Sequence, residues 1–239
     1  MRRTHLLCVA LLSLLAAAPA TQPGYTTTRP SPDGIGKVYL GREIANVMGH
    51  QAADWLERPE REDEEKPSVL IQHLKLQPTD TVADIGCGTG YFSLRMAKLV
   101  PQGKVLGVDI QSEMLDLLKK YAAERNVTNV EPILGTIEDP KLPVGKVDLV
   151  LLVDAYHEFD HPYEMMSHIA DSLTATGRVA LVEYRAEDPS VPIKPHHKMT
   201  EAQAIKEMAA VGLVHQSTDE SLPWQHLMFF TRPAPAPSK

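Results

Sequence analysis

The chain is poor in cysteine. Cys8 and Cys87 are the only two cysteines among 239 residues, and Cys8 lies in an N-terminal apolar run. If that run is removed, one cysteine remains, which excludes an intramolecular disulfide and a cysteine metal cluster. An excess of positive charge is also missing, because the formal net charge is −7 at pH 7. An acidic protein is a poor candidate for binding a phosphate backbone, so no nucleic-acid partner is expected.

Long apolar runs are scarce, and the first twenty residues hold the most prominent one. The stretch MRRTHLLCVALLSLLAAAPA begins with two arginines, continues with an apolar run from Leu6 to Leu15, and closes on small residues at Ala18 and Ala20. This order predicts a secretory signal peptide over residues 1–20 and an exported protein, periplasmic or secreted. The run is short for a membrane span, so no stable span is expected after cleavage. An uncleaved N-terminal anchor is the alternative.

Two segments lack periodic apolar residues. Residues 21–36 are rich in Pro, Gly and Thr and predict a flexible linker, and the tail 233–239 is expected to be disordered. Residues 37–76 read as a helical N-terminal extension. Their charged part, 57–66, is expected to be a solvated surface, with a lid over a binding site as the alternative. The sequence does not indicate an oligomeric state.

Short β-branched runs alternate with segments of helical spacing over residues 77–232, which we expect to form one domain. Thr200 and Gln203 form a capping-box pattern at the start of one such helix. Strands that alternate with helices predict a doubly wound α/β fold with a mostly parallel sheet. The expected strands are Val82–Ile85, Val105–Val108, Val130–Leu134, Val147–Val153, Arg178–Val182 and Leu227–Thr231.

A glycine-rich turn follows the first of these strands. The sequence VADIGCGTGY places Gly86, Gly88 and Gly90 at alternate positions, two residues after Asp84. Ligands of an open parallel sheet bind at the carboxyl ends of its strands, and glycines let a ligand approach the main chain there. The usual dinucleotide-binding spacing is G-x-G-x-x-G, but Tyr91 stands here where the third glycine would be.

The D-x-G-x-G-x-G pattern resembles the first motif of class I S-adenosylmethionine-dependent methyltransferases. The resemblance implies a Rossmann-like sheet of seven strands and a site for S-adenosyl-L-methionine, formed by the glycine turn and Asp84. It also implies that Asp109, at the end of the strand KVLGVDI, accepts hydrogen bonds from the ribose, with Ile110 beside it. In the family an acid follows the next strand and meets the adenine. Thr136 occupies that position here, so Glu138 or Asp139 is expected to replace the acid, and the main chain at Ile137 is expected to meet the ring.

Reacting groups are expected after the fourth strand, where the resemblance implies that the chain faces the sulfonium. The stretch VDAYHEFDH holds Asp154, His157 and Glu158 there, and we predict that they are catalytic, with His157 as the base. The long loop after the fifth strand is expected to shape the acceptor pocket. Its candidate substrate contacts are Glu183, Tyr184, His196 and His197.

The same stretch also matches the letters H-E-x-x-H of some zinc sites. Pro162 follows directly and is expected to begin a helix rather than to continue one, so we assign no metal site. Structural or incidental roles for His157 and His161 are the alternatives.

The segments LGREIANVMGH and WLERPERE, together with VDAYHEF, also resemble a group of exported, predicted bacterial methyltransferases. We therefore expect methyl transfer from S-adenosylmethionine to an unidentified small molecule. A non-catalytic nucleoside-binding module is the alternative, and a metal-dependent hydrolase is a further one.

Overall fold

The computed structural model describes residues 24–233 of the chain. The predicted signal peptide lies outside the described residues, as do residues 234–239 of the predicted tail. N-terminal sequencing of the protein from its natural host would test the expected cleavage after Ala20. Within residues 24–233, no helix has the length and apolar character needed to cross a membrane.

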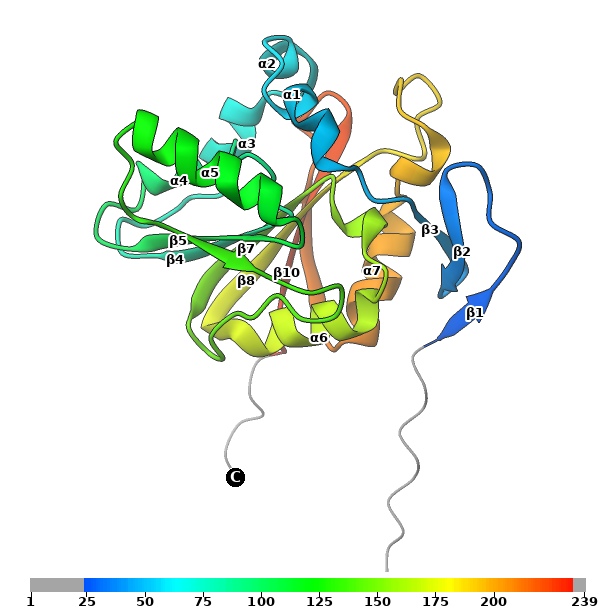
Figure 1. Ribbon diagram of the computed structural model, residues 1–239. Coiled ribbons are helices and arrows are strands. Elements are labelled where there is room, and N and C mark those ends of the chain that lie inside the picture. The colour runs from blue at the N-terminus through cyan, green and yellow to red at the C-terminus, as the bar shows by residue number, and fades with distance from the viewer. Residues whose placement is uncertain (1–23, 234–239) are drawn as a thin grey trace, which may run out of the picture.

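A mostly parallel sheet of seven strands organises the molecule (Figure 1). Its strand order is β6-β5-β4-β7-β8-β10-β9, and β10 runs antiparallel to both of its neighbours. This arrangement confirms the predicted doubly wound α/β fold. The strands are β4 (Thr81–Ile85), β5 (Lys104–Asp109), β6 (Val130–Leu134), β7 (Val147–Val153), β8 (Leu173–Tyr184), β9 (Val214–Asp219) and β10 (Gln225–Thr231).

Helices cover both faces of this sheet (Figure 1). One face packs against α6 and α7, and the other packs against α3 and α4. Thr200 accepts a hydrogen bond from the Gln203 amide at 3.1 Å, which confirms the predicted cap of α7. The helices are α3 (Pro67–His73), α4 (Ser93–Ala97), α5 (Ser112–Glu124), α6 (Pro162–Ser172) and α7 (Glu201–Ala210), with short 3-10 turns η2 (Tyr156–Glu158) and η3 (Pro195–His197).

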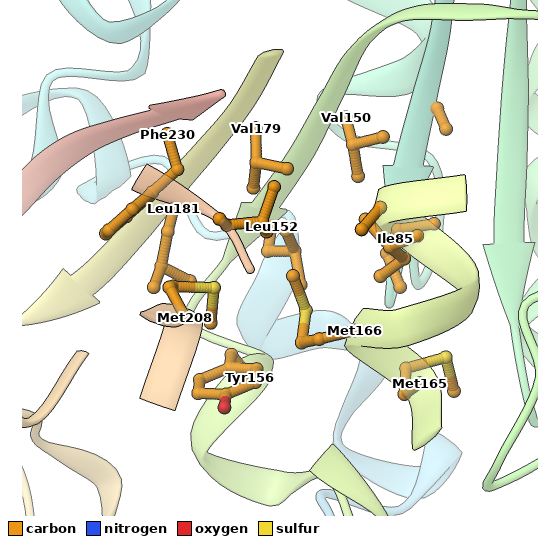
Figure 2. Packing of buried hydrophobic residues seen from close by; sticks show 14 of the residues in the cluster. Ile85, Val150, Leu152, Tyr156, Met165, Met166, Val179, Leu181, Met208 and Phe230 are labelled. Carbon is orange, nitrogen blue, oxygen red and sulfur yellow. The ribbon is translucent and has the colours of Figure 1, made fainter. Parts of the chain in front are cut away.

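The core follows the two-residue alternation of the buried strands. In β7, Val150 and Leu152 face one helical layer, while Leu149 and Leu151 face the other, and all four are fully buried. Figure 2 shows the first layer, where methionines of α6 and α7 fill the space beneath the sheet. Tyr156 closes this layer from the side of the loop after β7.

The structure corrects the expected linker over 21–36 and the expected helical extension from 37. Residues 25–45 instead contain a separate antiparallel sheet of three strands, and helical turns begin only at His50. Leu40 and Gly41 both have positive φ, 48° and 98°, which suits the two-residue turn of a tight hairpin. The elements are β1 (Tyr25–Thr27), β2 (Gly34–Tyr39), β3 (Arg42–Ala45), η1 (His50–Ala52), α1 (Ala53–Leu56) and α2 (Arg61–Glu65).

A buried ion pair attaches this small sheet to the main domain. Arg42 of β3 donates from two nitrogens to the two carboxylate oxygens of Glu207 on α7, each at 2.8 Å. The Tyr156 hydroxyl donates to the same carboxylate at 2.8 Å, and a third Arg42 nitrogen donates to the His157 carbonyl at 3.0 Å. Tertiary contacts therefore stabilise the strands of residues 25–45, although the composition of the part before residue 37 is that of a linker.

Removing Arg42 is expected to destabilise the protein strongly. An Arg42→Ala change leaves the fully buried Glu207 carboxylate without its cation, and breaking a buried pair costs about 3–5 kcal/mol of unfolding free energy. Urea unfolding monitored by circular dichroism measures this. Lys119→Ala, which removes the exposed partner of Asp116, is the matched control and is expected to cost less than about 1 kcal/mol. Equal losses in the two variants would contradict this role of Arg42.

Candidate active site

A cavity of about 1060 Å³ opens at the carboxyl ends of β4, β5 and β7. It lies where the strand order reverses, since the chain runs outward through β5 and β6 and returns to β7 beside β4. Typical ligand pockets have about 300–1,000 Å³, so this one has room for a nucleoside cofactor and a second small molecule. Its walls come from the main domain, from the N-terminal segment and from the loop after β8.

The glycine turn forms one wall, but its three glycines serve different purposes. All have positive φ, at 69° for Gly86, 53° for Gly88 and 86° for Gly90. Gly86 and Gly88 line the cavity. A Cβ on Gly90 would lie 2.2 Å from Leu118 of α5, and one on Gly88 would lie 2.5 Å from Leu56 of α1. Gly86 and Gly88 therefore expose main chain to the cavity, whereas Gly90 lies outside its wall and packs against Leu118; the positive φ favours glycine at all three positions.

Asp84 lies beneath this turn rather than in the cavity wall. Its carboxylate accepts a hydrogen bond from the Ser93 hydroxyl at 2.5 Å, and it is 3% exposed. Burial raises the pKa of Asp84, and the hydrogen bonds from Ser93 offset only part of this rise. The resulting pKa is about 6. The structure thus shows Asp84 joining the end of β4 to the start of α4. Its predicted direct contact with a cofactor stays a prediction.

Asp109 ends β5 on the opposite side of the turn and lines the cavity. Its carboxylate accepts hydrogen bonds from the amides of Gly88 and Gln111, both at 2.9 Å. Burial raises the pKa of Asp109. These two hydrogen bonds from backbone amides fix the carboxylate beside the glycine turn. They leave oxygen lone pairs free to accept hydrogen bonds from ribose hydroxyls.

Two exposed apolar side chains continue from Asp109 along the cavity. Ile110 and Ile137 are 39% and 45% exposed, and both line it together with Thr136. Such side chains suit the flat faces of a purine ring. Glu138, predicted beside them, is not part of the cavity wall, and its carboxylate lies 3.5 Å from the His161 ring.

Asp154 stands at the end of β7 in a strained conformation with φ of 49°. One carboxylate oxygen accepts a hydrogen bond from the side-chain amide of Gln225 at 2.8 Å. The other oxygen is buried and has no hydrogen-bond partner among the described residues. Burial raises the pKa of Asp154, and the nearby carboxylates of Glu65 and Glu183 raise it further. Asp154 itself lines the cavity.

His157 and Glu183 form a buried dyad. The His157 Nδ1 lies 2.6 Å from a Glu183 oxygen, and the His157 amide donates to the other oxygen at 3.2 Å. Burial lowers the pKa of His157, but the Glu183 carboxylate outweighs it and the net shift is upward. With Nδ1 occupied by Glu183, Nε2 is the nitrogen left to face His197 and the cavity.

Successive side chains of β8 point to opposite faces of the sheet, and this separates the two predicted substrate residues at its end. Glu183 lies behind His157, away from the cavity wall, whereas Tyr184 lines the cavity and donates to Glu65 at 2.7 Å. The neighbours on η3 also separate. His197 lines the cavity near His157, whereas His196 lies 3.1 Å from Glu43 of β3.

The N-terminal segment supplies cavity residues that the sequence analysis did not select. Arg61 and Glu65 of α2 line the cavity and form an ion pair at 2.7 Å, nearly buried, next to Asp154. Arg58 also pairs with Glu65, and its guanidinium stacks on Trp55. The spacing of Arg61 and Glu65, four residues apart on a helix, was the available signal. The charged segment 57–66 is therefore a wall of the cavity and not a solvated surface alone.

The sequence has relatives of known class over its central part. Residues 82–177 match a family model described as a methyltransferase domain. The uncharacterized methyltransferase YcgJ of Bacillus subtilis is 30% identical over 122 residues, which are 51% of this chain and 47% of that protein. A malonyl-[acyl-carrier protein] O-methyltransferase of Halalkalibacterium halodurans is 28% identical over 140 residues, 56% of this chain and 45% of that protein. The chain thus spans about half the length of these curated relatives.

A solved structure extends the likeness to 77% of the chain. The structure of a SAM-dependent methyltransferase from Aquifex aeolicus superposes with a TM-score of 0.72 at 19% identity, over 77% of this chain and 98% of that one. At this identity the match establishes the fold. Over residues 82–177, then, the chain is similar in sequence to a methyltransferase domain, and its seven-stranded sheet has the fold of a SAM-dependent methyltransferase.

Proposed function

We propose that the protein transfers a methyl group from S-adenosyl-L-methionine to a small molecule. The observation that carries this proposal is that one cavity is lined by the glycine turn and Asp109 and also by Asp154, His157 and Glu158. The first set suits a nucleoside cofactor, the second set suits a reacting acceptor, and the cavity has room for both. The similarity of residues 82–177 to a methyltransferase domain supports the same activity.

The cofactor would lie across the ends of β4 and β5. Asp109 accepts hydrogen bonds from the ribose hydroxyls, and Ile110 and Ile137 cover the adenine. The methionine end of the cofactor carries an ammonium and a carboxylate. Arg61 offers a cation for the carboxylate, and the Asp154 carboxyl group, which lines the same cavity, accepts from the ammonium.

Methyl transfer is an in-line displacement, and the protein has to align the acceptor and take its proton. His157 Nε2 faces the cavity while Glu183 holds Nδ1, so the ring has the orientation of a general base. The acceptor atom attacks the methyl carbon, the carbon–sulfur bond breaks, and its electrons neutralise the sulfonium. The O-methyltransferase among the relatives supports an oxygen acceptor.

Calorimetry with cofactor products tests the binding half of this proposal. S-adenosylhomocysteine is expected to bind at one site per chain, and NAD far more weakly, because Tyr91 replaces the glycine of a dinucleotide turn and Asp84 adds negative charge near a pyrophosphate. The same titrations with free adenosine and with AMP serve as controls for the methionine end. A preference for NAD would end the methyltransferase proposal.

A further inference from the structure

Three ligand-type side chains converge on one point of the cavity wall. His157 Nε2 lies 3.1 Å from His197 Nδ1 and 3.9 Å from Glu158 Oε1, and His197 Nδ1 lies 3.5 Å from the same oxygen. His157 and Glu158 belong to η2, and His197 comes from η3 after β8, forty residues further along the chain. All three side chains line the cavity.

These separations fit the coordination shell of a small metal ion. Nitrogen and oxygen ligands lie about 2.0–2.2 Å from Zn²⁺, so neighbouring ligands of a tetrahedral site are separated by about 3.3 Å. The observed distances lie on either side of this value, and small side-chain rotations equalise them. Two histidines and one carboxylate leave one position open, which is the arrangement of catalytic zinc sites. Mg²⁺ and Ca²⁺ prefer shells of oxygen alone and suit this set poorly.

Groups behind two of the three ligands hold them in place for such an ion. Glu183, fully buried, binds His157 Nδ1 at 2.6 Å and so directs the Nε2 lone pair toward the cavity. Ligating histidines almost always give their second nitrogen to a carboxylate or carbonyl in this way. The Met48 amide donates to Glu158 Oε2 at 3.1 Å, which leaves Oε1 for the ion. His157 and Glu158 are thus oriented by partners that do not compete with a metal.

We infer that His157, His197 and Glu158 bind one divalent transition-metal ion, represented by Zn²⁺, with its open position toward the acceptor. His161 is not one of the converging residues, so this site differs from the H-E-x-x-H arrangement considered from the sequence. That arrangement was set aside because the sequence predicts a helix that begins at Pro162. Pro162 does begin α6, and the His161 ring lies near Asp160 and Glu138.

The role of the ion rests on the proposed methyl transfer and defines an acceptor class. An acceptor hydroxyl or thiol that coordinates the ion loses its proton to solvent more readily. Its oxygen or sulfur then donates a lone pair to the methyl carbon, while the carbon–sulfonium bond breaks and leaves S-adenosylhomocysteine. No electron is gained or lost overall, so a redox-inert ion is sufficient. In the metal-loaded protein His157 acts as a ligand and not as the base: the ion lowers the pKa of the bound acceptor, and solvent takes the proton.

Zinc titration of chelator-treated, full-length protein tests the site directly. Calorimetry with ZnCl₂ is expected to find one ion per chain, and His197→Ala is expected to weaken its binding by more than about 100-fold. Glu183→Gln removes only the charge behind His157 and should weaken binding by about 10- to 100-fold at unchanged stoichiometry. His196→Ala is the matched control, because the neighbouring ring lies by Glu43 and should leave zinc affinity unchanged.

Two results would overturn the inference: wild-type protein that binds no zinc, or His197→Ala protein that binds it as tightly as wild type. Circular dichroism melts of each variant show whether a loss of binding comes from unfolding. A parallel titration with S-adenosylhomocysteine separates this inference from the proposed function. Zinc failure with cofactor binding leaves the methyltransferase proposal intact, and the reverse result removes that proposal while the metal site stands.

Discussion

A His157→Asn variant is expected to lose about 10²- to 10⁴-fold in turnover while keeping its cofactor affinity. Asparagine removes Nε2, which either takes the acceptor's proton or holds the ion that lowers the acceptor's pKa. Its amide still donates toward Glu183, so the buried carboxylate keeps a partner. Cofactor affinity should change little, because the contacts predicted for the adenosyl group lie at Gly86, Gly88 and Asp109.

The measurement combines two assays on the same variant. S-adenosylhomocysteine release is followed by mass spectrometry with a panel of small hydroxyl and thiol compounds, and cofactor binding is followed by calorimetry. His215→Ala on β9 is the control, since this histidine lies away from the cavity and contacts Thr218. Wild-type turnover in His157→Asn would remove His157 from the reaction, and the search would move to Asp154 and Tyr184.

An Asp109→Ala variant is expected to bind S-adenosylhomocysteine about 2–4 kcal/mol more weakly, which is about 30- to 700-fold. The change removes the two charge-assisted hydrogen bonds that we predict between the ribose and this carboxylate, which is 7% exposed. It also removes the acceptor for the amides of Gly88 and Gln111. A part of the loss will therefore come from a looser glycine turn, and the variant should melt at a lower temperature than wild type.

The control for this variant is Asp116→Ala on α5, which removes an exposed carboxylate that contacts only Lys119 among the described residues. Its cofactor affinity should equal that of wild type. Calorimetry below the melting temperature of both variants separates binding from unfolding. Unchanged affinity in Asp109→Ala would show that the ribose lies elsewhere and would leave the site after β5 without its main polar contact.

The sheet was predictable from the sequence because its signals are local. Val147–Val153 is a strand with the predicted bounds, and the glycine turn follows β4 as expected. The hairpin of β2 and β3 was missed, since its strands depend on contacts with α7, more than 150 residues away. The edge strand β9 was missed as well. It is largely exposed, so its residues lack the apolar alternation of a buried strand.

The site residues separate in the same way, into those that local sequence signals identify and those that only tertiary contacts bring to the cavity. Residues adjacent to the strand ends, such as Asp109 and Asp154, were named from the sequence and do line the cavity. Arg61 and Glu65 were not, because only the folded chain brings α2 over the ends of the strands. Glu183 was predicted to contact the substrate, but its side chain is not part of the cavity wall. The alternation of β8 places its side chain behind His157, and one residue of register decides between the two faces.

The contact between Arg42 and Glu207 also constrains how this chain can diverge. Arg42 also donates a hydrogen bond to the His157 carbonyl. This one guanidinium therefore connects the β2–β3 hairpin, α7 and the loop after β7 that carries the predicted reacting groups. A lineage that loses the arginine leaves a carboxylate buried without charge compensation. Such a lineage is viable only if the glutamate is replaced too. Positions 42 and 207 should therefore vary as a pair among homologous chains, and a domain copied without its first fifty residues should carry an uncharged residue at position 207.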